Sequence, residues 1–279
     1  MKTQIITLFL IIPIPLFSQK TEKDFITDDD GITVEKLNTT LSYDDNYNKD
    51  NKIYKIGRRF IYSYYYENHD GKKFLVGKGE PIKQQDYFIH DWKFIPIDSP
   101  TEETVKNIIL KPVTGNIFKN LLPDYNQTGI SYEYVMGNNL SLNSETTGVV
   151  ENEMNIWLHP PRSNFFEILE INPFPYIKAP YQMGNKWKWK LEIGDGWSDK
   201  RWKEWKGGIE NSYEYEITDR KNISTKLGNL DCYVITAKAT SRIGETGLIS
   251  YFSPDFGFVK LEYKNIDGTK TVLELEKIE

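Results

Sequence analysis

The stretch Thr-Lys-Leu-Gly-Asn-Leu-Asp-Cys-Tyr-Val-Ile, residues 225–235, combines a tight turn with the start of a β-strand. Gly228 suits the turn because a residue without a Cβ adopts positive φ at little cost. The residues after it form an alternating, strand-like run, which predicts a strand over 231–239. Cys232, the only cysteine of the chain, lies in this run, so we expect a buried core thiol.

Similar runs recur on both sides of this stretch. Apolar residues at alternate positions, bounded by Gly, Asn and Asp turns, predict strands over 130–136, 148–154, 155–159, 186–193, 210–219, 248–253, 258–264 and 271–277. The aromatic content of 14% agrees, because aromatic side chains favour sheets. The pattern predicts an all-β layer.

The N-terminal half carries strand signals and one helix signal. Strands are predicted over 32–37, 53–66, 72–77 and 87–97, with Asp70-Gly71 as a hairpin turn. A helix is expected over 101–109, because Ser99 or Thr101 can cap it and acidic residues fill its first turn. A weaker helical or turn segment is expected over 116–122.

Two segments before residue 180 have ambiguous patterns. Residues 164–171 are apolar and predict a strand, with a short helix as the alternative. Residues 172–180 contain three prolines and predict an extended linker across a sheet edge.

The N-terminus has the pattern of a secretory signal peptide. Lys2 precedes an apolar run from Ile5 to Phe17, and Ser18 is a small residue at the position of cleavage. The run is shorter than the ~20 residues that a transmembrane helix needs. We therefore expect residues 1–18 to be removed, no transmembrane segment in the mature chain, and a periplasmic or secreted location. An uncleaved anchor is the alternative.

The remaining chain divides by composition. Residues 19–52 are polar and rich in Asp and Asn, which predicts a mobile leading segment. Residues 53–279 form the predicted β-rich region, with a soft boundary near 123–130. Asp44, Asn46, Asn48 and Asp50 alternate as in calcium loops, but Lys49 and Lys55 replace the required Gly and Glu.

Charge and motif content exclude several classes of function. The net charge of −5 is dispersed and no basic block exists, which argues against nucleic-acid binding. The three histidines, His69, His90 and His159, lack metal-ligand spacing, and His159 is expected in a surface loop. No nucleophile elbow, phosphate loop or dinucleotide fingerprint occurs. We therefore expect no catalytic signature, no metal and no cofactor.

The C-terminal third resembles a known group. Gly184-Asn185-Lys186-Trp187 is followed by the 225–235 stretch and by Tyr-Phe-Ser-Pro-Asp-Phe-Gly-Phe-Val-Lys at 251–260. This order resembles the uncharacterised periplasmic β-proteins of the DUF3108-like group over about residues 179–264. The resemblance implies a mainly β fold: a curved antiparallel sheet or half-barrel, here with one or two short helices. It implies no catalytic residues.

Five tryptophans fall within nineteen residues, at Trp187, Trp189, Trp197, Trp202 and Trp205. Trp187 and Trp189 share one face of a strand, whereas the other three lie in a charged, Gly-containing loop over 194–206. Packing as core and lid is one interpretation. A binding surface is the other, since exposed tryptophan suits apolar ligands, glycans and protein partners. These five are the candidate ligand-binding residues.

Three hypotheses follow for the function. The first is an exported non-enzymatic β-protein that binds an apolar small molecule, a glycan or an envelope protein through a concave sheet and the Trp-rich loop. The second is an envelope-polymer hydrolase with paired carboxylates, for which Glu151 and Glu153 are candidates. The sequence does not distinguish these two residues from part of a solvated strand face. The third is a structural or assembly protein. Enzymatic activity stays open.

Overall fold

The structure is a computed structural model that describes residues 24–28, 31–36, 51–84, 87–114 and 126–279. Three expectations lie outside these residues: the signal peptide over 1–18, the calcium-like run over 44–50 and the helical segment over 116–122.

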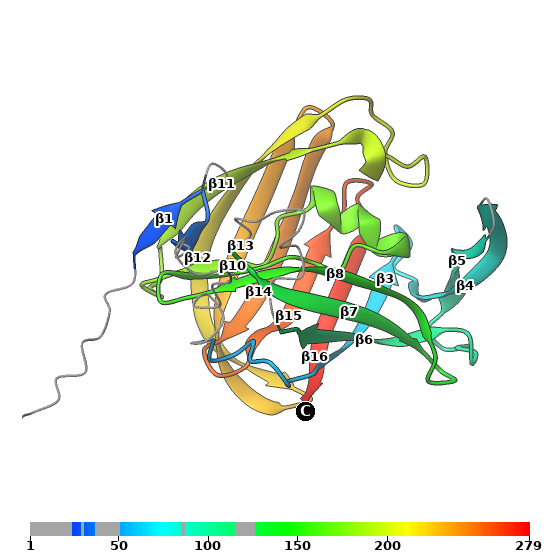
Figure 1. Cartoon of the computed structure of the whole chain (residues 1–279), viewed down its shortest axis with the longest axis horizontal. Coiled ribbons are helices and arrows are strands. Elements are labelled where there is room, and N and C mark those ends of the chain that lie inside the picture. Colours follow the sequence, from blue (N-terminus) through cyan, green and yellow to red (C-terminus); the bar gives the residue numbers. More distant parts are fainter. Residues whose placement is uncertain (1–23, 29–30, 37–50, 85–86, 115–125) are drawn as a thin grey trace, which may run out of the picture.

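Twelve strands follow one another in an antiparallel sheet that curves into a nearly closed barrel (Figure 1). The predicted mainly β fold with a curved antiparallel sheet is confirmed. The spatial order is β10 (Tyr176–Lys178), β9 (Asn155–Leu158), β8 (Ser141–Glu151), β7 (Thr128–Met136), β6 (Val105–Pro112), β3 (Phe60–Glu67), β16 (Lys270–Ile278), β15 (Gly257–Lys264), β14 (Gly244–Ser253), β13 (Gly228–Ser241), β12 (Ile209–Thr225) and β11 (Lys186–Ile193).

Alternation places one face of each strand inside the barrel. In β12, Tyr213 and Tyr215 are buried, and they pair with Trp189 and Trp187 of β11. The intervening residues form a ladder of exposed ion pairs, Lys186–Glu216, Lys188–Glu214 and Lys190–Glu210. Exposed ion pairs add little stability. A shift of the strand register by one residue would, however, place these charges inside the barrel, so the ion pairs favour the observed register.

The helix expected over 101–109 is wrong, because Val105–Pro112 forms β6 between β3 and β7. Its residues Ile108 and Leu110 are fully buried in the barrel. The polar residues before it make a turn, in which the Thr101 amide donates to the Thr104 hydroxyl (2.8 Å). A capping signal is local and weak, and pairing on both sides of a β-branched segment overrides it.

The strand predicted over 164–171 is also wrong, and the alternative of a short helix is right. Asn164–Ile171 forms a 3₁₀ helix, η1, with six buried residues. Its Phe166 packs on Tyr64 and Tyr134 of the inner sheet face, with ring centroids 5.1 and 5.5 Å away. An apolar run that is buried on nearly all sides has no period that distinguishes strand from helix.

The proline-rich segment 172–180 lies at the sheet edge, as predicted, but part of it is regular. Tyr176–Lys178 forms β10, which pairs with β9. The three prolines lie outside these three residues. Proline has no backbone N–H to donate, and it is tolerated here because β10 is at the edge of the sheet.

The described parts of 19–52 contact the barrel, and the expected mobility of the segment as a whole stays a prediction. Hairpin β1 (Phe25–Thr27) and β2 (Thr33–Glu35) is held by the Asn155 side chain, which accepts from the Thr33 amide (3.1 Å) and donates to its carbonyl (2.9 Å). Gly31 lies so close to Trp189 that an added Cβ would be 3.3 Å from the Trp189 Cβ.

A long hairpin of β4 (Lys73–Gln84) and β5 (Tyr87–Pro96) leaves the barrel as an arm (Figure 1). The predicted turn before it is confirmed: the Asn68 amide donates to the Lys72 carbonyl (3.0 Å), and Gly71 has φ 76°. The base of the arm pairs with the end of β3, where Tyr66 lies opposite Phe74. This pairing brings β5 next to η1.

Candidate functional site

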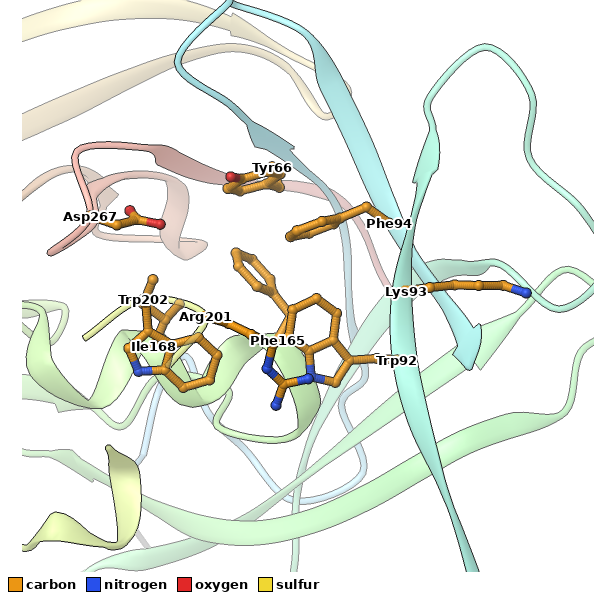
Figure 2. A pocket seen from close by; sticks show the side chains of 9 residues that line it. All are labelled: Tyr66, Trp92, Lys93, Phe94, Phe165, Ile168, Arg201, Trp202 and Asp267. Atoms are coloured by element: carbon orange, nitrogen blue, oxygen red, sulfur yellow. The ribbon is translucent and has the colours of Figure 1, made fainter. Parts of the chain in front are cut away.

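A cavity of about 300 Å³ lies where the arm meets η1 and the loop 194–206 (Figure 2). This is at the lower end of the range for small-molecule sites. Its lining comes from five separate parts of the chain and is mainly aromatic: Tyr66, Trp92, Lys93, Phe94, Phe165, Ile168, Arg201, Trp202 and Asp267.

The aromatic wall is braced by contacts between its own rings. Tyr66 and Phe94 are parallel, with centroids 4.2 Å apart. Phe165 meets both of these rings edge-on, at 5.0 and 5.1 Å, and meets Trp92 in the same way at 5.5 Å. Edge-to-face and offset arrangements are the favourable ones for aromatic rings. The wall is therefore preorganised before any ligand arrives.

Arg201 joins the Trp-rich loop to the arm. Its Nη2 bonds the Asp199 carboxylate at 2.6 Å and its Nη1 bonds Asp91 of β5 at 3.1 Å. Its guanidinium carbon lies 4.3 Å from the centroid of the Trp92 ring, a cation–π distance. One side chain thus fixes two walls of the cavity relative to each other.

Asp267 is the one carboxylate among the nine lining residues. Its Oδ1 accepts hydrogen bonds from the Thr269 amide (3.0 Å) and hydroxyl (2.6 Å). Within the described residues, no basic side chain forms an ion pair with it. Lys93 offers no such charge, because its ammonium group points away from the cavity (Figure 2).

A buried polar cluster lies at η1 near the cavity. Burial raises the pKa of Glu170 to about 8 and the pKa of Glu167 to about 7. Burial, followed by the nearby Arg162, lowers the pKa of His159 to about 3, so its imidazole is neutral. The surface loop expected for His159 is wrong, since the residue is 9% exposed.

The geometry of this cluster fixes the imidazole. His159 Nδ1 lies 2.8 Å from the Pro160 carbonyl, which assigns the proton of the neutral ring to Nδ1. The unprotonated Nε2 lies 3.4 Å from Glu170 Oε1 and can only accept a hydrogen bond. A protonated Glu170 carboxyl suits this position because it can donate one. The cluster stabilises the corner after β9, where Glu145 also accepts hydrogen bonds from Tyr134, Arg162 and Ser163.

The carboxylates suggested for a hydrolase do not form a pair in a cleft. Glu151 is 8% exposed and accepts the backbone N–H groups of Lys52, Ile53 and Tyr54 at 2.6–2.8 Å. It is an anchor for residues 52–54, which corrects its interpretation as part of a solvated face. Glu153 is exposed in the turn that follows.

The structure separates the five predicted tryptophans. Trp202 lines the cavity, and its Nε1 donates to the Trp197 carbonyl (3.2 Å). Trp197 is half-buried, and Trp205 is buried below the loop, where its amide donates to Ser198 Oγ (2.9 Å). Trp187 and Trp189 stack on Tyr215 and Tyr213 inside the barrel. A binding role for all five tryptophans stays a prediction.

Sequence reasoning missed most of the cavity wall. Tyr66, the neighbours Trp92 and Phe94, and Phe165 come from three distant parts of the chain, and all lie outside the tryptophan cluster over 187–205. The available signal was the alternation of side chains along β3 and β5. In β5 this alternation places Trp92 and Phe94 on the same face, and in β3 it assigns Tyr66 to the buried face. It does not tell which strands meet.

The chain is similar to known proteins in fold and not in sequence. The chain matches no protein-family model, so the resemblance to the DUF3108-like group is not confirmed, and no curated protein is significantly similar in sequence. A Bacteroides fragilis protein described as exported, with a YmcC-like fold, is 12% identical, with a TM-score of 0.45 over 81% of this chain and 97% of that one.

Two further solved structures are similar. A Parabacteroides distasonis protein described as a lipoprotein is 12% identical, with a TM-score of 0.44 over 81% of this chain and 97% of its own. The lipoprotein YmcC of Escherichia coli is 11% identical, with a TM-score of 0.36 over 84% and 90% of the two chains. Because the TM-scores and sequence identities are this low, these structures assign neither a function nor a site residue to this chain.

Two kinds of feature are absent from the described residues. No helix among them combines the length and apolar character needed to cross a bilayer. No group of three or more His, Cys, Asp or Glu side chains among them is placed to hold a metal ion.

Proposed function

We propose that the chain is an exported, non-enzymatic β-protein that holds a small apolar ligand in the cavity between β5, η1 and the loop 194–206. The observation that carries this proposal is the aromatic wall around about 300 Å³ of space. Export rests on the signal-peptide pattern of residues 1–18. The descriptions of the similar structures as exported proteins or lipoproteins agree with a periplasmic or secreted location.

The wall favours apolar binding for two reasons. Each Å² of apolar ligand surface removed from water contributes roughly 25 cal/mol. The rings of Tyr66, Phe94 and Phe165 are already ordered by one another, so little side-chain entropy is lost on binding. The polar lining residues Arg201 and Asp267 then select among apolar ligands.

The test is a titration of the mature protein with N-phenyl-1-naphthylamine, an uncharged aromatic probe whose fluorescence rises in apolar surroundings. We expect saturable binding at one site. Trp92→Ala and Phe94→Ala should each weaken it by about tenfold, which corresponds to about 1.4 kcal/mol. Trp189→Phe is the matched control, because Trp189 stacks on Tyr213 away from the cavity.

Three outcomes contradict the proposal: no saturable binding, binding unaffected by the two cavity variants, or an equal loss in Trp189→Phe. Thermal melting of each variant establishes that the fold is retained. Oligosaccharides added as competitors in the same titration test the glycan alternative.

A further inference from the structure

The charges around the cavity are unevenly balanced. Asp267 lines it, and among the lining residues Arg201 is the one cation directed at it, with Asp91 and Asp199 as ion-pair partners of Arg201. Arg201 is bonded to two of these carboxylates, so its charge is already compensated. Asp267 makes no ion pair within the described residues, and its Oδ1 is occupied only by Thr269. The cavity therefore carries an uncompensated negative charge.

The aromatic rings add to this preference. The face of an aromatic ring is the negative end of its quadrupole and attracts cations within about 6 Å of the centroid. The protein already uses the Trp92 face in this way for the Arg201 guanidinium at 4.3 Å. Trp202 and Phe165 present further rings to the cavity, and Figure 2 shows Asp267 and Trp202 on one side of it with Phe94 and Trp92 on the other.

We infer that the ligand of this cavity is an organic cation with an alkylammonium head and an apolar body. The head lies between the Asp267 carboxylate and the Trp202 ring, and the body lies against Phe94 and Phe165. This inference rests on the proposed function, and it names the chemical class that the proposed site selects.

The same charges disfavour anionic ligands. A carboxylate or phosphonate placed in the cavity would meet Asp267 without a compensating cation. Arg201 cannot take that role without giving up Asp199 or Asp91, with which it forms hydrogen bonds of 2.6 and 3.1 Å. Two negative charges brought together out of water repel each other, and the negative faces of the rings do not offset this repulsion.

Three probes of matched shape test the inference: benzyltrimethylammonium, its uncharged carbon isostere neopentylbenzene, and benzylphosphonate. Each is measured by displacement of N-phenyl-1-naphthylamine. We expect the cation to bind at least about tenfold more tightly than the isostere, equivalent to about 1.4 kcal/mol, and the anion to bind more weakly than both.

Asp267→Asn is the decisive variant, because the amide oxygen can still accept from Thr269 while the charge is lost. It should reduce the affinity for benzyltrimethylammonium to that of neopentylbenzene and leave neopentylbenzene within twofold. Asp255→Asn, an exposed carboxylate in the turn before β15, is the control for one lost charge and should change neither affinity.

The outcomes separate the two proposals. Equal affinities for cation and isostere, or no effect of Asp267→Asn, would overturn the cation selectivity while leaving an apolar binding site. Absence of binding by all three probes and by N-phenyl-1-naphthylamine would overturn both.

Discussion

The guanidinium carbon of Arg201 lies 4.3 Å from the Trp92 ring centroid, and its Nη1 bonds Asp91 of the same strand. Arg201 belongs to the loop 194–206, whereas Trp92 belongs to the arm. One exposed cation therefore links two segments more than a hundred residues apart at the mouth of the cavity.

Arg201→Ala should loosen the loop without unfolding the barrel. An exposed ion pair contributes about 0.2–1 kcal/mol and an exposed cation–π contact about 0.5–1 kcal/mol, so the melting temperature should fall little. Hydrogen exchange of amides in 194–206 should become faster. Arg220→Ala is the control, because Arg220 pairs with Asp231 and stacks on Tyr233 (5.0 Å) on β12 and β13. Unchanged protection in 194–206 would contradict the link.

Glu170→Gln should stabilise the protein increasingly as the pH rises. In the folded state burial raises the pKa of Glu170 to about 8, from an ordinary value of 4.5. Between these values the unfolded state has released this proton while the folded state retains it, so the free energy of unfolding falls as pH rises. The loss begins near pH 4.5 and is complete above about pH 8.

Urea unfolding at several pH values measures this effect as a difference between Glu170→Gln and the native chain. The difference should grow from pH 4.5 to 8 and then level off. Glu153→Gln, at an exposed carboxylate, should show no such trend. A difference that is constant with pH would mean that Glu170 is ionised in the folded protein.

Glu151→Ala should be strongly destabilising. The change leaves the buried N–H groups of Ile53 and Tyr54 and the N–H of Lys52 without the acceptor that now holds them at 2.6–2.8 Å. Loss of charge-assisted bonds to buried donors should lower the free energy of unfolding by about 3–5 kcal/mol. Denaturant titration measures it. Glu153→Ala should change stability by less than about 0.5 kcal/mol, and an equal effect of the two variants would refute the anchor role.

Cys232 should be unreactive in the folded protein. Its side chain is fully buried in β13, and burial raises the pKa of the thiol to about 11, so the thiolate is scarce at neutral pH. Dithionitrobenzoate should release one equivalent of chromophore in urea and almost none in native buffer over the same time. Cys232→Ala gives the background. Rapid stoichiometric reaction of the native protein would place the thiol at the surface.

Local patterns were sufficient for much of the barrel. Alternation predicted β11, β13, β15 and β16 close to their observed bounds, and the same alternation buried Cys232. Asp70-Gly71 predicted its hairpin correctly. Side-chain period and turn chemistry act over a few residues, so the sequence alone determines them.

The tertiary structure decided the rest. The segment 101–109 had helix-capping residues but became β6, because β3 and β7 supply partners on both its sides. The apolar segment 164–171 became η1 because it packs on the inner sheet face. The cavity needs Tyr66, Phe165 and Trp202 together, and their proximity depends on pairing between distant strands. Such pairing is a property of the whole sheet, and no single stretch of sequence encodes it.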